Sequence, residues 1–246
     1  SFAEILRRRG YATGYAGKWH LDGTGKPQWS PARKFGFSDN RFMFNRGHWK
    51  KMEDTAKGPR VAPRNDRGRP TYAVAGADEK SFTTDWLTNK AIEFIRSQRG
   101  KPFCYFVSFP DPHGPNTVRA PYDTMFANVK VPIPTSMHKT AAQTPAWAKP
   151  ERNLNEARLR RLMPAYYAMV KCIDDNVGKI MKALEKEGLA DNTIVVFTAD
   201  HGDLRGEHGR QNKGVPLEGS AKVPFVIQWP GNIKPGTRME QAIGCV

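Results

Sequence analysis

The chain has 246 residues, enough for one large domain or two small ones, and its hydrophobic and charged fractions of 39% and 26% are those of a globular protein. No apolar run approaches the roughly 20 residues that a membrane-spanning helix needs, so we expect no membrane span. The net charge of +15 favours a polyanionic partner. No helix-turn-helix, zinc-finger or RNP motif is present, however, so we do not expect the chain to bind nucleic acid.

Predicted helices and strands alternate along the first half of the chain. Apolar spacing and turn residues predict a helix over 1–9 that begins with a capping box, a strand over 11–17, a strand piece within 35–44, a helix over 83–98 and a strand over 102–109. The first helix should bury the face that carries Phe2, Ile5 and Leu6. The strand over 102–109 is a nearly continuous apolar run, which predicts burial of both its faces.

The second half contains the longest predicted helix, over about 155–187, whose apolar stripe is expected to face the core. Further strands are predicted in "NTIVVFTADHG" (192–202) and "VPFVIQWPG" (223–231). Apolar strands that alternate with helices are typical of a parallel-rich sheet with helices on both faces. The sequence therefore predicts an α/β fold arranged as an α/β/α sandwich with a mostly parallel central sheet.

Two stretches, 23–80 and 114–153, are poor in periodicity, so we expect them to form irregular regions that set specificity. Residues 50–69 hold seven basic and three acidic side chains, which makes them the most basic patch of any length. A tryptophan can stack on a sugar and an arginine can bind sulfate with two hydrogen bonds, although an ordinary loop role fits each of the four candidate residues better when it is taken singly. The candidate contacts are Arg46, His48, Trp49 and Lys50.

The cysteines do not indicate a metal site, because no C-x-x-C spacing occurs among Cys104, Cys172 and Cys245. Cys104 and Cys172 lie in apolar periodic segments, which predicts buried free thiols.

Four short segments place polar groups where predicted strands end: "GKWH" (17–20), "DPHGP" (111–115), "ADHGD" (199–203) and "QNKG" (211–214). The carboxyl ends of strands are where an open α/β sheet usually holds its ligand. Each segment supplies groups that suit an anionic substrate and a metal ion. Taken alone, each also fits a structural role.

Asp200 and His201 follow the apolar run "TIVVF" and offer an oxygen and a nitrogen ligand to a metal. A salt-bridged pair at a strand end would have the same sequence. Lys18 and His20 are two residues apart and point the same way on an extended chain, so they can hold an anion and donate a proton. Solvated side chains around an inward-facing tryptophan are the alternative.

His113 lies between two prolines, whose fixed backbone can hold an imidazole accurately, or it simply ends a strand. Lys213 follows Asp200 by thirteen residues in a glycine-rich loop and is otherwise an ordinary surface lysine. In combination, the four segments are far more specific than any one of them.

The ordered segments resemble the type I sulfatase family. "LRRRGYATGYAGKWHLDG" is similar to the family's "GYxTxxxGKWHLG" motif, "SFPDPHGP" to its histidine loop, and "TADHGDLRGEHGRQNKG" with "VPFVIQWPG" to its later metal-site block. The resemblance implies an alkaline-phosphatase-like α/β/α fold and hydrolysis of sulfate esters. It also implies a divalent cation and a formylglycine made from Cys or Ser.

The resemblance assigns a role to each matched residue. Lys18 and Lys213 look like the sulfate-binding lysines, and His20 like the histidine that helps the formylglycine hydrate eject sulfate. His113 looks like the proton donor to the leaving alcohol. Asp200 and His201 look like metal ligands. Calcium is the first choice for the metal, with magnesium, manganese or zinc as alternatives because imidazole suits softer ions.

The family's C/S-x-P/A-x-R nucleophile motif and its paired N-terminal aspartates are absent from this sequence. We therefore expect a sulfatase-type catalytic domain over 1–246 that is truncated at both ends and inactive alone, with the formylglycine in an upstream segment. The family suggests a periplasmic or secreted location. The expected substrate is a sulfated carbohydrate, with an aryl sulfate second. Two alternatives stay open: a phosphodiesterase or phosphonate monoester hydrolase of the same superfamily, and a catalytically dead polyanion-binding module.

Overall fold

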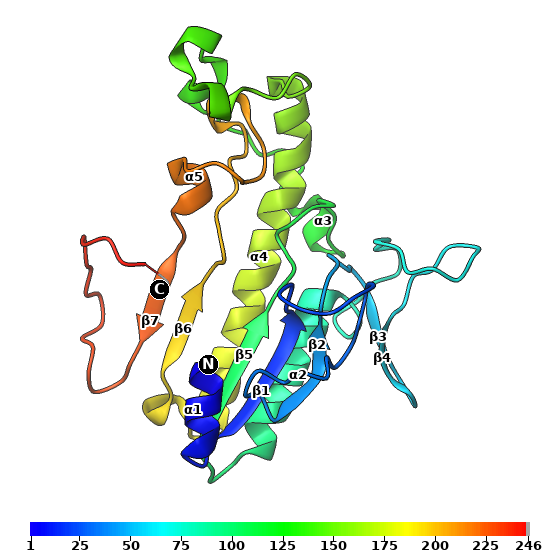
Figure 1. Ribbon diagram of the computed structural model, residues 1–246, viewed down its shortest axis with the longest axis vertical. Helices are drawn as coiled ribbons and strands as arrows, with labels where there is room; N and C mark the ends of the chain where they lie inside the picture. Colours follow the sequence, from blue (N-terminus) through cyan, green and yellow to red (C-terminus); the bar gives the residue numbers. More distant parts are fainter. Residues whose placement is uncertain (245–246) are drawn as a thin grey trace. The chain divides into compact units, whose positions relative to one another are not determined.

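A computed structural model describes residues 1–244 of the chain (Figure 1). The chain divides into two compact units, each of which is described by itself. The first comprises Ser1–Pro132 and Ala157–Ala183, and the second comprises Ile133–Glu156 and Leu184–Val246. Within the described residues, no helix has the length and apolarity that crossing a membrane requires. Cys245 lies outside the described residues.

Five α-helices and seven strands form the regular structure of the described chain. The helices are α1 (Phe2–Arg8), α2 (Thr83–Ser97), α3 (Tyr122–Met125), α4 (Glu156–Lys186) and α5 (Glu218–Ala221). The strands are β1 (Ala12–Lys18), β2 (Asp39–Phe44), β3 (Met52–Thr55), β4 (Gly58–Val61), β5 (Phe103–Ser108), β6 (Val195–Thr198) and β7 (Phe225–Gln228). Short 3₁₀ helices span Thr135–His138, Ala141–Gln143, Ala146–Ala148, Ala190–Asn192 and Glu207–Gly209.

A three-stranded parallel sheet, in the order β2-β1-β5, forms the centre of the first unit. In the middle strand, Gly14 pairs with Asp39 of β2 on one side and Tyr105 of β5 on the other. Parallel neighbours need long crossover connections, and α2 lies in the connection between β2 and β5. The parallel sheet and its helices confirm the predicted α/β class.

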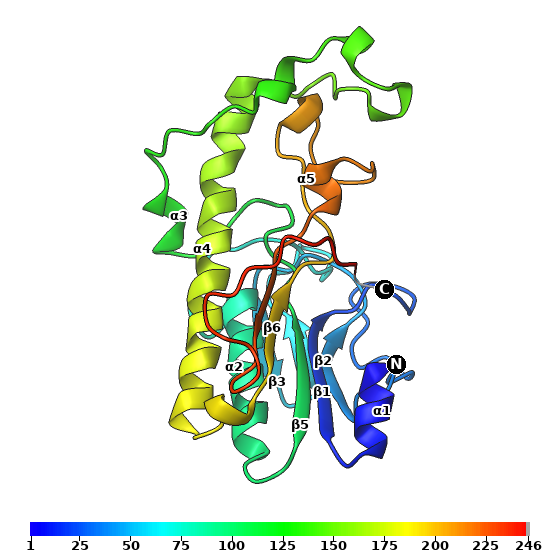
Figure 2. The same cartoon turned by 90° about the vertical axis from the view of Figure 1, so that its left-hand side faces the viewer.

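Side chains alternate across the sheet, so neighbouring residues of β1 enter different cores. Tyr15 packs with Ala3 of α1 and with Phe37, whereas Ala16 lies in a cluster with Trp86 and Leu87 of α2. The two helices accordingly cover opposite faces of the sheet, as Figure 2 shows. This arrangement gives the first unit the predicted order of helix, sheet and helix.

The first helix begins as predicted, because Ser1 Oγ accepts a hydrogen bond from the Glu4 backbone N–H. Its expected apolar face is wrong in detail. Phe2 and Ile5 are exposed and only Ala3 is fully buried. The strand β5 also departs from full burial, since Phe106 is 42% exposed. β5 is an edge strand of the described sheet, and one edge therefore lacks a neighbour.

The irregular region 23–80 contains more regular structure than expected. Besides β2, it folds a two-stranded antiparallel hairpin of β3 and β4, in which Met52 pairs with Val61. These two residues are fully buried in the core beneath the sheet, whereas the intervening charged residues face outward. Each strand has four residues, too few for their alternation to stand out in a stretch rich in charge.

The long helix α4 confirms the prediction for 155–187, but its buried face is shifted from the expected stripe. Leu159, Met163 and Ile173 are buried as predicted, whereas Val170 is 43% exposed. The buried face also takes in smaller and polar residues, namely Ala168, Met169, Cys172 and Asn176.

In the second unit, β6 and β7 pair as a two-stranded antiparallel sheet in which Val196 lies opposite Ile227. Both strands are where the sequence predicts them, although this pair is antiparallel. Val196 and Val226 are at least half exposed. At the end of the 3₁₀ helix Glu207–Gly209, the Gly209 carbonyl accepts a hydrogen bond from the backbone N–H of Glu151.

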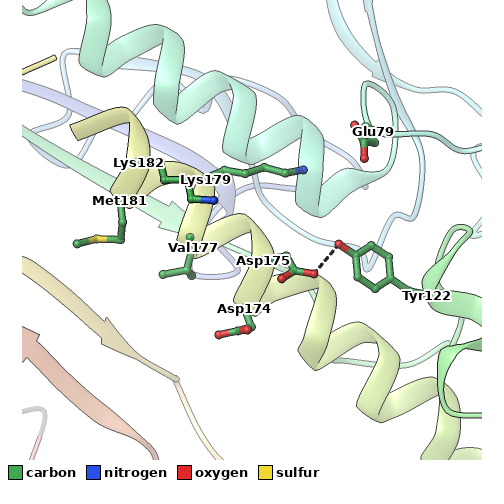
Figure 3. Close-up of a pocket in the computed structure, with 9 residues that line it drawn as sticks. Glu79, Tyr122, Asp174, Asp175, Val177, Lys179, Met181 and Lys182 are labelled. Atoms are coloured by element: carbon green, nitrogen blue, oxygen red, sulfur yellow. Dashed lines mark hydrogen bonds between the residues drawn. The ribbon is translucent and has the colours of Figure 1, made fainter. Parts of the chain in front are cut away.

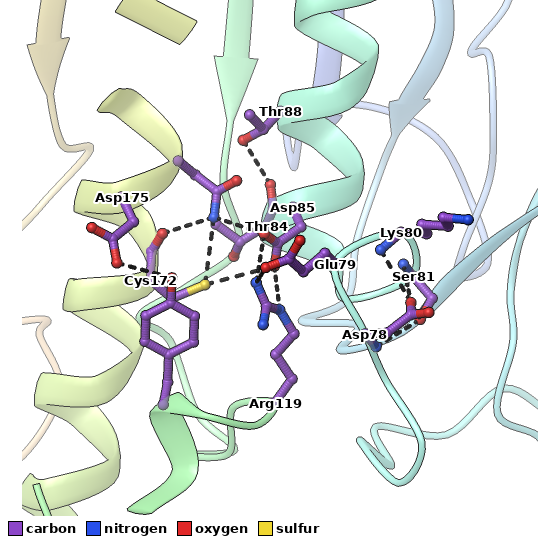
Figure 4. A network of polar contacts seen from close by, with 12 residues as sticks. Asp78, Glu79, Lys80, Ser81, Thr84, Asp85, Thr88, Arg119, Cys172 and Asp175 are labelled. Atoms are coloured by element: carbon purple, nitrogen blue, oxygen red, sulfur yellow. Dashed lines mark hydrogen bonds and ion pairs between the residues drawn. The ribbon is translucent and has the colours of Figure 1, made fainter. Parts of the chain in front are cut away.

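A buried carboxylate in the first turn of α2 joins three parts of the first unit (Figure 4). Asp85 is 1% exposed and accepts two hydrogen bonds from the Arg119 guanidinium, at 2.7 and 2.9 Å. From α4, Lys179 Nζ and Asn176 Nδ2 donate to the same carboxylate at 2.8 and 3.1 Å. The Cys172 thiol lies 3.8 Å away.

Burial alone would raise the pKa of Asp85, but the hydrogen bonds from Arg119, Lys179 and Asn176 outweigh it and lower this pKa below its ordinary value. Burial raises the pKa of the Cys172 thiol to about 12, and the Asp85 charge adds to that shift. Cys172 is therefore a buried neutral thiol, as predicted. Cys104 is half-buried, and burial raises its pKa as well.

We expect Asp85→Asn to lower the free energy of unfolding by about 3–5 kcal/mol, because the change removes the close charge partner of the buried Arg119 cation and leaves only the exposed Glu79 carboxylate, 3.5 Å away. Urea unfolding monitored by circular dichroism measures the loss. Asp123→Asn, at an exposed carboxylate of α3, is the matched control and should change stability by less than about 0.5 kcal/mol. Equal effects of the two substitutions would contradict this account of the network.

The same ion pair predicts a pH dependence. Because the folded pKa of Asp85 is lowered, its stabilising contribution is present at neutral pH and disappears as the pH falls below the ordinary carboxyl value of about 4. Wild-type stability should therefore drop more steeply between pH 5 and pH 2 than that of Asp85→Asn. Parallel curves for the two proteins would rule out this contribution.

Candidate functional site

Three loops of the first unit begin where the parallel strands end. β1 ends at Lys18, β2 at Phe44 and β5 at Ser108. Because parallel strands finish at the same edge of a sheet, the residues that follow them are brought to one place. Those segments carry His48 and His113 of the predicted site, next to Lys18 itself.

Lys18, His48 and His113 form a contiguous polar cluster at this edge. Lys18 Nζ lies 2.9 Å from His48 Nε2. The His48 ring stacks on the His113 ring, with 3.5 Å between centroids and 5° between planes. Two predicted substrate-binding residues and the predicted proton donor are thus brought together by segments up to 95 residues apart in the chain.

The proton positions in the cluster follow from which atoms can donate. An ammonium group only donates, so His48 Nε2 accepts from Lys18 and the His48 proton sits on Nδ1. A carbonyl only accepts, so His113 Nδ1, which lies 3.0 Å from the Gly114 oxygen, carries a proton. In the neutral ring, Nε2 is therefore the nitrogen of His113 that can accept a proton.

The backbones of β1 and β5 approach each other closely at Gly17, near the carboxyl ends of both strands. Gly17 has φ +108°, and a Cβ at this position would lie 1.9 Å from the Ser108 carbonyl oxygen. Only glycine therefore allows the ends of β1 and β5, and so the residues that follow them, to lie this close.

The other predicted residues of the first unit differ in their settings. His20 is exposed, and its φ of +57° ends the extended chain on which it was expected to point the same way as Lys18. Its backbone N–H donates to the Asn45 carbonyl at 2.7 Å. Arg46, two residues before His48, is exposed.

Trp49 and Lys50 are not surface contacts, because they are 2% and 0% exposed. Lys50 Nζ instead pairs with Asp111 Oδ1, 2.5 Å away. Asp111 belongs to the segment "DPHGP", in which only His113 was a predicted site residue. A buried lysine is rare, and no pattern in the sequence signals this pair.

In the second unit, Asp200 and His201 follow β6, as predicted. Asp200 Oδ2 lies 3.3 Å from His201 Nε2, and His201 Nδ1 lies 2.8 Å from the Gly202 carbonyl oxygen. A hydrogen bond from Nδ1 to a carbonyl fixes the ring so that Nε2 offers its lone pair beside the carboxylate. The carboxylate oxygen and Nε2 are therefore close enough for both to reach one cation, and the same contact fits the ion pair that the sequence leaves open as the alternative.

Gly202 is held by a hydrogen bond from its N–H to the Ser220 carbonyl at 2.7 Å, and a Cβ there would lie 2.2 Å from the Gly219 oxygen. Lys213 is half-buried in the loop that follows. Across residues 1–244, no group of three or more His, Cys, Asp or Glu side chains is arranged to hold a metal ion. Asp200 and His201 thus fit a divalent cation as two of its ligands, and further ligands are needed to complete the shell.

A hollow of about 520 Å³ opens beside α4 in the first unit (Figure 3). Its charged lining residues are Glu79, Asp174, Asp175, Lys179 and Lys182. Asp175 accepts a hydrogen bond from the Tyr122 hydroxyl at 2.9 Å. Three carboxylates against two ammonium groups make this hollow a poor place for a sulfate ester.

Comparison with known proteins identifies the relatives of this chain. The family model of the sulfatases matches residues 1–245. An arylsulfatase of Clostridium perfringens is 34% identical over 177 residues, which cover 66% of this chain and 35% of that protein. An ulvan-active sulfatase of Formosa agariphila is 30% identical over 235 residues, which cover 93% of this chain and 40% of that protein. The chain spans less than half the length of either relative.

Solved structures show the same fold. A protein solved in complex with its substrate, D-glucosamine-2-N,6-O-disulfate, superposes with a TM-score of 0.71 at 22% identity. The match covers 96% of this chain and 56% of that one. The expected alkaline-phosphatase-like α/β architecture is thereby confirmed, whereas the roles of individual residues stay predictions.

We expect Gly17→Ala to destabilise the protein by at least about 2 kcal/mol, since the new Cβ must displace the Ser108 carbonyl and also adopt a left-handed backbone. Gly10→Ala is the matched control, because Gly10 has φ +86° but no atom within 4 Å of its Cβ position. Urea unfolding of both variants separates the clash from the backbone strain. Losses of the same size would show that the contact between β1 and β5 is not limiting.

Proposed function

This chain belongs to the sulfatase family, and we propose that the protein that carries it is a metal-dependent sulfuric ester hydrolase. The observation that carries the proposal is the cluster of Lys18, His48 and His113 at the carboxyl ends of the parallel strands. A cation and two imidazoles in contact suit an oxyanion substrate whose leaving group needs a proton.

Cleavage of a sulfate ester leaves negative charge on the sulfuryl oxygens and builds it on the ester oxygen. We assign Lys18 and Lys213 to the sulfuryl oxygens, where fixed cations stabilise charge that persists through the transition state. We assign His113 Nε2 to the ester oxygen, because a proton from imidazole avoids the release of a bare alkoxide. His20 is exposed, and we assign it to proton exchange at the nucleophile.

Sulfatases generally use a divalent metal and a formylglycine. In this chain Asp200 and His201 would hold the metal, with calcium as the first choice and magnesium, manganese or zinc as alternatives. When present, the metal would polarise a sulfuryl oxygen and the hydrated formylglycine would supply the nucleophile. No residue of this sequence fits the formylglycine motif, so we assign that group to residues outside these 246.

We propose a sulfated carbohydrate as the substrate class, with an aryl sulfate second. The net charge of +15 favours a polyanion, and two of the similar proteins act on or bind ulvan and a sulfated glucosamine. Arg46 and His48 lie in the region 23–80, which we propose sets specificity together with 114–153. A polymeric substrate would place the enzyme outside the cytoplasm, in the periplasm or secreted.

The activity is tested on the full-length protein with 4-nitrophenyl sulfate and bis(4-nitrophenyl) phosphate. We expect faster hydrolysis of the sulfate, and a fall in kcat of about 100- to 10,000-fold in His113→Ala, because a general acid contributes on that order. His138→Ala, at an exposed histidine of the second unit, is the control and should keep wild-type activity. Faster cleavage of the phosphate diester would identify a phosphodiesterase instead. Absence of both reactions, with heparin binding that weakens in salt, would identify a polyanion-binding module.

Residues 1–246 alone should bind calcium weakly and should not turn over sulfate esters. Calcium takes six to eight oxygen ligands, and Asp200 and His201 supply only two donors. Isothermal titration of the 246-residue protein with CaCl2 should give a Kd above about 1 mM. Micromolar affinity that disappears in Asp200→Ala, or turnover of 4-nitrophenyl sulfate, would contradict this expectation.

A further inference from the structure

We propose that the buried ion pair between Lys50 and Asp111 is a positioning device for His113, the group that the proposed function makes the proton donor. The catalytic role of His113 rests on the proposed function. The positioning of His113 by the ion pair rests on the geometry of the first unit.

The pair is removed from water. The Lys50 and Asp111 side chains are 0% and 2% exposed, and the ammonium nitrogen lies 2.5 Å from Asp111 Oδ1. The second carboxylate oxygen accepts a hydrogen bond from Thr84 Oγ1 at 3.2 Å. Lys50 Nζ also lies 3.2 Å from the Met169 sulfur of α4.

Both members of the pair lie next to His113. Asp111 is two residues before it, and Lys50 Nζ also donates to the His113 carbonyl oxygen at 3.4 Å. Lys50 is in turn two residues after His48, whose ring stacks on His113. The short segment 48–50 therefore touches His113 twice, at its ring and at its main chain.

The first turn of α2 holds the other end of the same loop. Thr84 bonds to Asp111 before His113, and its neighbour Asp85 binds Arg119 after His113. Two consecutive residues of a rigid helix thus fix the loop at both ends. These contacts restrict displacement of His113 relative to Lys18.

A buried ion pair is a poor device for stability alone. Well-packed apolar side chains of similar volume often stabilise a protein as well or better, because two charges need not be taken out of water. A pair that is charged, shielded from solvent and bonded to the loop that carries His113 suits geometric control. An error of about 1 Å in the position of a catalytic group can lower the rate about 100-fold.

The test uses Lys50→Met, Asp111→Asn and the double variant Lys50→Met/Asp111→Asn in the full-length protein. Either single change leaves one uncompensated polar or charged group and can prevent folding, whereas the double variant removes both charges and keeps similar volumes. Lys90→Met is the control, because Lys90 is a mostly buried lysine of α2 that pairs with Asp54 and Glu93 and is not in contact with the loop.

In the folded double variant we expect kcat for a sulfate ester to fall about 10- to 100-fold while KM changes less than about threefold. The loss should grow as the leaving group becomes more basic, because proton donation then matters more. In Lys90→Met both constants should stay within twofold of wild type. A double variant with wild-type kcat, or one whose loss lies only in KM, would overturn the inference.

A second readout does not depend on catalysis. The ¹H–¹⁵N imidazole signals of His113, assigned by comparison with His113→Ala, should shift in the double variant and stay in place in Lys90→Met. Unchanged His113 signals in the double variant would overturn the positioning role. If the wild-type protein hydrolyses no sulfate ester, the proposed function fails, and the NMR result still decides whether Lys50 and Asp111 position His113.

Discussion

The first unit depends on the alignment of three parallel strands whose carboxyl ends finish at one edge. Each strand delivers a different polar group there, and the groups meet only because β1 lies between β2 and β5. The fit is tight enough that Gly17 has no room for a side chain beside Ser108. Apolar cores cover both faces of the sheet, one around Tyr15 and the other around Ala16. They hold the strands in register and so keep the strand ends together.

Buried charge is the second constraint, and it is concentrated at the start of α2. Thr84 and Asp85 are both buried, and each takes a partner from the loop that carries His113. Charges taken out of water are tolerable only when every one is paired and hydrogen-bonded. Asp85 meets that condition with donors from two segments, the loop that carries Arg119 and the helix α4, so displacement of either would leave a buried carboxylate with too few partners.

Much of this architecture could be predicted from the sequence, because its helices have a regular apolar periodicity and most of its strands lie in apolar runs. The α2 and α4 spans, β1, β5, β6 and β7 all follow from periodicity. The hairpin of β3 and β4 could not, since four-residue strands among charges carry little pattern. The ion pair of Lys50 and Asp111 could not either. Its members are 61 residues apart, and a lysine within a basic stretch is expected on the surface.

The hydrogen-bonding capacities of Lys18, His48 and His113 limit where the protons of this cluster can lie. Lys18 can only donate, so the His48 nitrogen that faces it, Nε2, carries no proton. Two imidazolium rings 3.5 Å apart would repel each other, so the close stacking needs at least one neutral ring, and the contact with Lys18 makes His48 that ring. His48 thus lies in contact with both Lys18 and His113. Under the proposed function, a sulfate ester would meet Lys18 at its sulfuryl oxygens and His113 at its leaving oxygen, with the His48 ring in contact with both residues.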